Sequence, residues 1–402
     1  MLAGETRRRR TFASLSIRNY RLYLTGQAVS GAGTWMQNIA IGWFALQLSH
    51  SGAVLGLVTG TRYAPPLLLA PWGGLIADRV RIRPLLITTQ AGACLVSLAL
   101  GIVAGTGHGT LPALFSLVTL LGLIEAVDNP GRQSLIGRLV PAAYVPNAVT
   151  LASVAANVSR AVGPGAAGAT IGGFGVATCF FVNAASFAAA LAGLVMLRTD
   201  AFVPTPVDEG PIGGVGAGLS YAWRTRDISG PLIMVAITGT LTWEFPVSLP
   251  LITSGAFHGT ATDYGLAMSA LGVGAVAGGL LAARRADVTI RMLSVTAIVW
   301  GAMILAAALA PALSVLYVLM FGVGAGAITF NSAAKSLLQV SSRPQMRGRV
   351  MALWFMAWQG TTVIGAPLVG AIGNALGGRY ALGAGAVAAI AVGGVHLASS
   401  GR

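Results

Sequence analysis

Residues 175–197 read GVATCFFVNAASFAAALAGLVML and contain no Asp, Glu, Lys or Arg. An α-helix satisfies its own backbone hydrogen bonds, and roughly 20 apolar residues in a helix cross a hydrocarbon core about 30 Å thick. The chain has eleven further long apolar stretches, and seven of these also lack Asp, Glu, Lys and Arg. They lie at 22–48, 53–77, 84–107, 111–131, 145–171, 229–254, 264–283, 292–310, 312–334, 350–372 and 380–398. The sequence therefore predicts an all-α membrane protein with twelve transmembrane helices.

The composition excludes an ordinary soluble protein. The chain is 55% hydrophobic and 9% charged, with a mean hydropathy of +0.77, whereas a soluble domain is about 25% charged. Cys94 and Cys179 both lie inside apolar stretches, where we interpret them as small buried side chains rather than as a disulfide. No nucleotide-binding loop, nucleophilic triad or Cys/His metal spacing occurs. We therefore expect no enzyme activity, no cofactor and no metal site.

The net charge of +14 reflects topology rather than nucleic-acid binding. If the apolar stretches alternate in direction, nearly all arginines fall on one side, including Arg7–Arg10, Arg79–Arg83 and Arg343–Arg349, and the opposite loops contain only Arg379. Basic loops face the cytoplasm. We predict a multi-pass protein of the cell inner (plasma) membrane with cytoplasmic termini and anionic lipid beside the basic loops.

The longest polar interval divides the chain into two halves. We predict a cytoplasmic basic segment at 1–21, a six-helix bundle at 22–197, a cytoplasmic linker at 198–228, a second six-helix bundle at 229–398 and a cytoplasmic end at 399–402. The halves repeat each other weakly: Asn129, Gly163 and Gly168 recur 202 residues later as Asn331, Gly365 and Gly370. Two repeats in the same orientation are typical of transporters in which one half rocks against the other. We expect the protein to be a monomer.

The segment GLIADRVRIRP at 74–84 resembles motif A of the major facilitator superfamily, G-x-x-x-D-R-x-G-R-R/K. Gly74, Asp78, Arg79 and Arg83 match, whereas Arg81 and Ile82 depart from the pattern. The resemblance implies the major facilitator fold and a gate on the cytoplasmic side. It places Asp78 near Arg349 and pairs a motif arginine with Asp128, and we assign Arg132 to the same gate.

The segment GPGAAG at 163–168 resembles motif C of that superfamily, which is associated with drug–proton antiporters. Pro164 removes a helix hydrogen bond, and Gly163 and Gly168 allow close packing, so we expect a bend at a helix interface. A generic packed kink is the alternative, and Ser159 departs from the pattern. Residues 129–136, 157–164, 183–187 and 346–351 are similar to the branch that contains enterobactin exporters and macrolide or multidrug efflux proteins.

Ionisable groups at membrane depth are costly and usually face a cavity or a partner. A buried carboxyl group favours its protonated form, and a nearby arginine favours the charged form. We propose Glu244 as the proton-carrying acid and Glu125 as a second candidate. A static ion pair of Glu244 with Arg62 or Arg160 is the alternative, and Glu125 has the alternative of belonging to the cytoplasmic charge network.

Further polar and aromatic residues share helix faces with these groups. Helical spacing puts Glu125, Asp128 and Arg132 on one face, and Thr240, Glu244 and Ser248 on another. The stretches that contain them correspond to cavity-lining helices of the superfamily. The remaining candidates for the substrate cavity are Gln27, Thr34, Gln37, Asn38, Arg62, Arg160, Trp354 and Trp358. Simple packing is the alternative for the two tryptophans.

These observations favour a secondary active transporter that exports a drug-like or siderophore-like small molecule by alternating access, in exchange for protons. One alternative is uptake of a sugar or metabolite. Another is a membrane sensor or assembly partner that transports nothing, although the longest loop, about 30 residues, leaves little room for an output domain.

Overall fold

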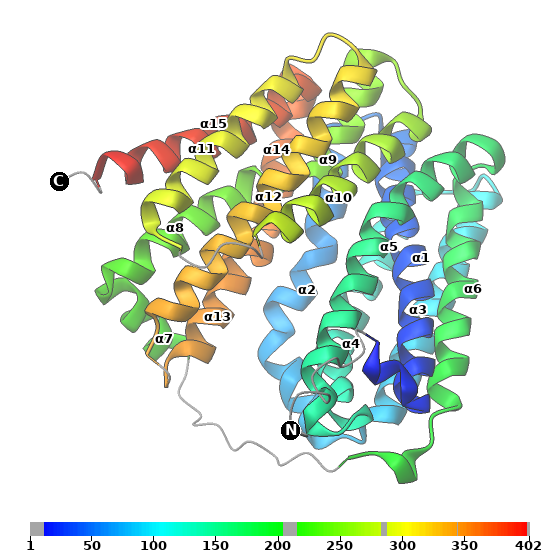
Figure 1. Ribbon diagram of the computed structural model, residues 1–402. Helices are drawn as coiled ribbons and strands as arrows, with labels where there is room; N and C mark the ends of the chain where they lie inside the picture. The colour runs from blue at the N-terminus through cyan, green and yellow to red at the C-terminus, as the bar shows by residue number, and fades with distance from the viewer. Residues whose placement is uncertain (1–11, 204–214, 283–287, 344, 400–402) are drawn as a thin grey trace, which may run out of the picture.

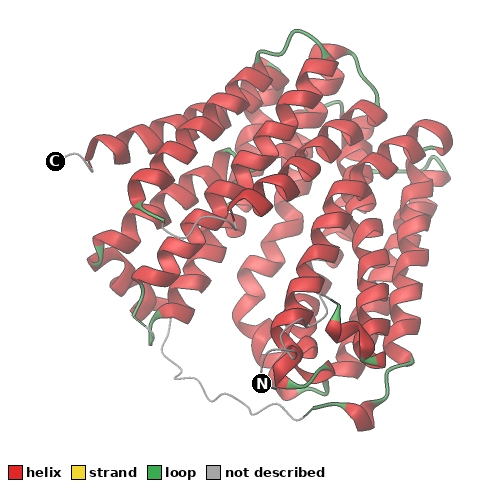
Figure 2. Cartoon of the chain, viewed as in Figure 1, coloured by secondary structure: helices red, strands yellow, loops and turns green. Residues whose placement is uncertain are grey.

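The computed structural model describes residues 12–203, 215–282, 288–343 and 345–399, without the side chains of 70–79, 215–217, 226 and 399. The described chain is helical and contains no strand (Figure 2). The first helices are α1 (Arg18–Ser49), α2 (Gly52–Arg79), α3 (Ile82–Gly105), α4 (Leu111–Leu139), α5 (Val145–Phe174) and α6 (Val176–Val195). The later helices are α7 (Val215–Arg224), α8 (Arg226–Leu241), α9 (Phe245–Leu251), α10 (Ala261–Ala282), α11 (Ile290–Ala308), α12 (Leu313–Ser341), α13 (Arg347–Phe355), α14 (Thr362–Leu376) and α15 (Gly378–Ser399).

The predicted class, a helical membrane protein, is confirmed. Nine helical stretches of the described residues are long and apolar enough to cross a membrane. Helices α1, α2 and α5 include the residues of the other three predicted stretches. Helices α4 and α12 extend beyond the apolar limits that we predicted, to Leu139 and Ser341, because the helix continues past the hydrocarbon-compatible residues into polar sequence.

Two predicted single helices are interrupted, which corrects the sequence analysis. The stretch 229–254 forms α8 and α9 with a break at Thr242–Glu244, and a wider turn follows at 252–256. The stretch 350–372 forms α13 and α14 with a wide turn at Met356–Gly360 between them. Pro246, at the start of α9, has no backbone N–H, so one hydrogen bond of the helical ladder is missing where the first break lies.

The helices pack as two groups, α1–α6 and α8–α15, that lie on opposite sides of the molecule in Figure 1. Within the first group α1 packs on α5 and α6, and α3 on α4 and α6; within the second, α10 packs on α12 and α11 on α15. Between the groups, the principal contacts join α5 to α10 and α2 to α14. The surface of the described helices carries many exposed apolar side chains, such as Leu68, Val318 and Val395, as expected where lipid replaces water.

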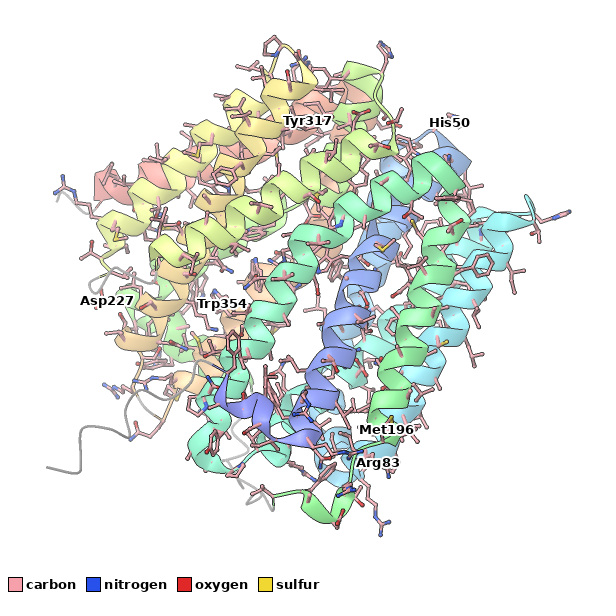
Figure 3. The ribbon with its side chains drawn as sticks, turned by 45° about the vertical axis from the view of Figure 1, so that its right-hand side comes forward. His50, Arg83, Met196, Asp227, Tyr317 and Trp354 are labelled. Atoms are coloured by element: carbon pink, nitrogen blue, oxygen red, sulfur yellow. The ribbon has the colours of Figure 1, made fainter. Side chains whose placement is uncertain are left out.

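Glycines allow the close approach between the two groups. A Cβ on Gly168 of α5 would lie 2.9 Å from the Thr262 Cα of α10, and one on Gly52 of α2 would lie 2.8 Å from the Gly370 carbonyl of α14. Gly52 follows His50 by two residues, and Asp263, next to Thr262, accepts a hydrogen bond from Tyr317 at 2.7 Å. His50 and Tyr317 lie at one end of the molecule, opposite Arg83 and Met196 (Figure 3). The two groups are therefore in contact at the His50 end.

Candidate functional site

Glu244 lies in the break between α8 and α9. Its side chain is buried, with 2% of the residue exposed, and its backbone is not helical (φ −80°, ψ 37°). Its carbonyl oxygen accepts hydrogen bonds from the amides of Val247 and Ser248, at 3.0 and 2.9 Å, and so starts α9. The carboxyl oxygen Oε1 has no hydrogen-bond partner among the described residues. The fold thus holds a buried carboxyl group at an irregular point of the backbone.

Glu244 faces a cavity of about 90 Å³ between the two helix groups. The first group contributes Trp35, Thr59, Tyr63 and Arg160 to its walls. The second group contributes Trp243, Trp358, Gln359 and Thr362, among others. A site formed by both groups changes when the groups move relative to each other, which is the geometry that alternating access requires.

Two larger cavities adjoin this one at Trp35. One, of about 350 Å³, lies within the first group, and the other, of about 280 Å³, lies between the groups. The walls of the first contain the predicted cavity residues Gln27, Thr34, Gln37, Arg62 and Arg160. They also contain Glu125, the second candidate for proton coupling, and the gate residues Asp128 and Arg132. Asn38, Thr34 and Glu125 line the second, together with Gln359. The structure therefore brings most of the polar candidates of the first half together around neighbouring cavities that share Trp35.

Arg62 of α2 pairs with Glu125 of α4 rather than with Glu244. The distance from Arg62 Nη2 to Glu125 Oε1 is 2.5 Å, and Arg62 Nη1 donates to Asn38 Oδ1 of α1. The Arg62 side chain is 9% exposed and that of Glu125 28% exposed. A charge at this depth is stable only with such partners. Glu244 forms no ion pair with a described residue, so the alternative of a static pair with Arg62 or Arg160 is not found in this structure.

Asp128 is the centre of a second polar cluster. It forms an ion pair with Arg132, one turn later in α4, and its Oδ1 accepts from Thr89 Oγ1 at 2.6 Å and from Gln90 Nε2 at 3.0 Å. Arg132 also donates to Gln27 Oε1 of α1. We did not predict Thr89 and Gln90, although two adjacent polar residues in the 84–107 stretch were a usable signal.

Of the motif A arginines, Arg83 does not pair with Asp128. Arg83 instead donates to the carbonyl oxygens of Leu194, at 3.0 Å, and Val195 at the end of α6. Both residues lie in the last turn of α6, where carbonyl oxygens lack the amides of a continuing helix, and an arginine satisfies them well. The side chains of Gly74, Asp78 and Arg79 lie outside the described residues, as does any contact of Asp78 with Arg349.

Arg160 of α5 lies over the ring of Trp35, with the guanidinium carbon 5.2 Å from the ring centroid. Its Nε atom is buried without a hydrogen-bond partner among the described residues, and no described carboxylate forms an ion pair with it. Arg160 lines both the cavity beside Glu244 and the larger cavity of the first group. Arg160 is therefore a cation with an aromatic neighbour and an Nε–H group that donates to no described residue.

The motif C-like residues lie in one continuous helix, α5, between two neighbouring helices. Gly163 is buried against α1, where a Cβ would lie 2.5 Å from Trp35 Cβ. On the α10 side, the Gly168 carbonyl accepts from Thr262 Oγ1 at 3.0 Å, and the Gly165 amide donates to Ser269 Oγ at 2.7 Å. The expected packing at a helix interface is therefore present, and α10 is its partner across the two groups.

The aromatic and hydroxyl candidates of the second half divide into two sets. Trp358 lines the cavity beside Glu244 and stacks on Trp354 at 5.3 Å between ring centroids. Trp354 is not among the wall residues beside Glu244, and Lys335 Nζ lies 5.2 Å from the centroid of its ring. Thr240 donates to the Ala236 carbonyl and Ser248 is buried in α9; neither is among the wall residues beside Glu244. The helix break separates these hydroxyls from the face that regular spacing predicted.

The family assignment rests on nearly the whole chain. A family model described as transmembrane secretion effector, of the MFS type, matches residues 9–400. The chain belongs to this family. Transmembrane secretion effectors of this type are transporters rather than enzymes, so the recognition of a major facilitator transporter from the sequence is confirmed.

Individual relatives agree with the family. The Staphyloferrin A transporter of Staphylococcus aureus is 26% identical over 250 residues, which are 61% of this chain and 62% of that protein, so the match spans less than two thirds of the relative. A bacterial homologue of the human lysosomal transporter Spinster, in an inward-facing and occupied conformation, superposes with a TM-score of 0.75 at 14% identity, over 95% of this chain and 96% of that one. A bacterial homologue of the iron transporter ferroportin, in an inward-facing state, gives 0.73 at 15% identity, over 96% and 99%. The two structures show that the fold is that of a multi-pass transporter.

Proposed function

We propose that this protein is a secondary active exporter that exchanges a small molecule for protons by alternating access. In this proposal twelve helices cross the inner (plasma) membrane as two halves, 22–197 and 229–398, joined by a cytoplasmic linker. The protein acts as a monomer, both termini lie in the cytoplasm, and the basic loops contact anionic lipid. Membership of a secretion family supports transport out of the cell. The location of nearly all arginines on one side of the predicted helices supports the orientation of the chain in the membrane.

The carboxyl group of Glu244, which has no ion-pair partner among the described residues, is the observation that carries the proposal. An isolated carboxylate at membrane depth is costly, and a bound proton removes that cost. A positively charged group of a substrate removes it too, because it supplies the missing partner. Proton and substrate would then exclude each other at one carboxyl group, which is the requirement for antiport.

The contacts between the halves support an alternating mechanism. α5 meets α10 and α2 meets α14 at the His50 end, whereas the cavities reach residues near the other end, such as Tyr23 and Arg132. With cytoplasmic termini, this is an inward-facing state that loads substrate from the cytoplasm. Separation of the same helices would open the opposite side.

Inside-out vesicles with an acidic interior test this function. A panel of cationic drugs, macrolides and siderophores is added, and accumulation inside the vesicles is followed. We expect accumulation with wild type and its loss in the Glu244→Gln variant at equal expression, because an amide cannot exchange a proton. Asp227→Asn, which changes an exposed carboxylate at the start of α8, is the matched control and should accumulate normally.

Two results would count against the proposal. Equal accumulation in Glu244→Gln and wild type would remove Glu244 from the coupling. Accumulation only with the reversed orientation of the vesicles would favour the uptake alternative.

A further inference from the structure

We infer that the substrate is a zwitterion that carries one carboxylate and one ammonium group on an apolar or aromatic body. Arg160 would bind the carboxylate and Glu244 the ammonium. The inference deepens the proposed function, on which it rests for the statement that the bound molecule is transported.

The first argument is that two opposite charges face one cavity without using each other. Arg160 comes from α5 and Glu244 from the α8–α9 break, and both line the cavity of about 90 Å³ between the halves. The ion pairs of the described residues are Arg62 with Glu125 and Arg132 with Asp128. Arg160 Nε and Glu244 Oε1 both lack a hydrogen-bond partner among these residues. A molecule that supplies a carboxylate and an ammonium would complete both groups at once.

The charge balance excludes singly charged molecules as equally good ligands. A cation that pairs with Glu244 leaves Arg160 without a counter-ion and is repelled by it. An anion that pairs with Arg160 makes only one of the two charged contacts and leaves Glu244 to bind a proton. Hydrogen bonds between charged partners are about twice as strong as neutral ones, so a ligand that makes both contacts gains most. Arg62 and Glu125, which line adjoining cavities, neutralise each other and do not change this balance.

The walls indicate the body of the ligand. Trp35, Tyr63, Trp243 and Trp358 line the same cavity as the two charged residues. The rings of Trp243 and Trp358 lie 5.5 Å apart, edge to face, and the Trp35 ring holds the Arg160 guanidinium in position. Ring faces of this kind bind apolar and planar groups, and an arginine already ordered by a ring loses less entropy when it binds an anion. The adjoining cavities of about 280 and 350 Å³ leave room for a longer apolar body.

The same arrangement makes the substrate and the proton move in opposite directions. The ammonium of the ligand and a proton compete for Glu244, while the carboxylate at Arg160 is not affected by that exchange. Release of the zwitterion lets Glu244 take up a proton, and binding of the zwitterion displaces it. This is antiport without any requirement for a net positive substrate.

Binding to purified protein tests the inference with three probes of one skeleton: L-phenylalanine, phenethylamine and 3-phenylpropionate. They carry both charges, the ammonium alone and the carboxylate alone. Isothermal titration calorimetry gives each dissociation constant. We expect L-phenylalanine to bind at least about tenfold more tightly than either of the other two, since each charged hydrogen bond contributes this much or more.

Two variants separate the two contacts. Arg160→Gln should reduce the affinity for L-phenylalanine to that for phenethylamine, and it should not weaken phenethylamine binding, because the charge that repels phenethylamine is gone. Glu244→Gln should reduce the affinity for L-phenylalanine to that for 3-phenylpropionate. Asp227→Asn is the control and should keep the wild-type order. If a variant does not fold, the order of the three probes on wild type still decides.

The inference is overturned if L-phenylalanine binds wild type no more tightly than the singly charged probes, or if Arg160→Gln weakens L-phenylalanine and phenethylamine equally. The binding experiment needs no gradient. If the protein prefers the zwitterion but the vesicles show no proton-driven accumulation, the inference stands and the exporter is refuted. If the vesicles show proton-driven accumulation but the protein does not prefer the zwitterion, the exporter stands and the inference is refuted.

Discussion

Substitution of Gly168 by alanine should open the end of the transporter that this structure holds closed. A Cβ at this position would lie 2.9 Å from Thr262 Cα and 3.0 Å from the carbonyl oxygens of Ala261 and Thr262, whereas ordinary contact begins at 3.4 Å. The obstructing atoms are backbone, so α5 and α10 must separate by about 0.5 Å, and overpacking of this kind costs about 1–3 kcal/mol. The gain in helix propensity from alanine applies to both states and cancels.

The expected effect is a shift of about 5- to 150-fold toward the state open at the His50 end, because about 1.4 kcal/mol corresponds to a factor of ten. We would measure it with a Ser269→Cys substitution, since the Ser269 hydroxyl meets the Gly165 amide in the closed interface. In a background without Cys94 and Cys179, an impermeant maleimide added outside should label the introduced thiol correspondingly faster when Gly168 is replaced by alanine.

Gly173→Ala is the matched control. It lies in the same helix, and a Cβ there meets nothing within 4 Å. Equal labelling rates in the Gly168 and Gly173 variants would refute the idea that this glycine contact holds the outer end closed.

Two further substitutions test the buried polar groups. Arg62→Gln removes the partner of Glu125 and should destabilise the protein by about 1–3 kcal/mol. The loss is smaller than for a fully buried pair because the Glu125 side chain is 28% exposed. Thermal unfolding in detergent measures the change in stability, and an unchanged Tm would contradict the prediction. Gln37→Leu leaves Ser97 Oγ and Asn183 Nδ2, now 2.7 and 2.8 Å from Gln37 Oε1, without their acceptor. It should cost about 1–3 kcal/mol for each group without changing proton coupling, so loss of coupling with unchanged Tm would show that Gln37 has a transport role instead.

The sequence predicted the helices well because length and apolarity determine which segments can lie in lipid. The break at Thr242–Glu244 was not predicted, since Pro246 and Pro250 are compatible with a kinked continuous helix and only packing decides where the ladder opens. The displacement of Thr240 and Ser248 from the site follows from that one break.

Candidate residues could be selected by polarity at depth, but their partners could not. Arg62 was considered as a partner of Glu244, and it pairs with Glu125 because a long side chain on α2 reaches across to α4. Trp35, Tyr63 and Trp243 were missed, since aromatic residues are common in apolar stretches and nothing local distinguishes a wall from the core. The packing role of the motif C-like glycines followed from their small size, whereas the identity of α10 as partner required the tertiary structure.

The central claim, that a substrate exchanges with protons through Glu244, is tested most directly by proton release. Inside-out vesicles are energised to an acidic interior, and a quenched pH-sensitive dye reports protons leaving the vesicles as substrate is added. The account predicts substrate-triggered recovery of fluorescence with wild type and none with Glu244→Gln. Accumulation of substrate with no proton release from wild-type vesicles, or the same release from Glu244→Gln vesicles, would contradict it.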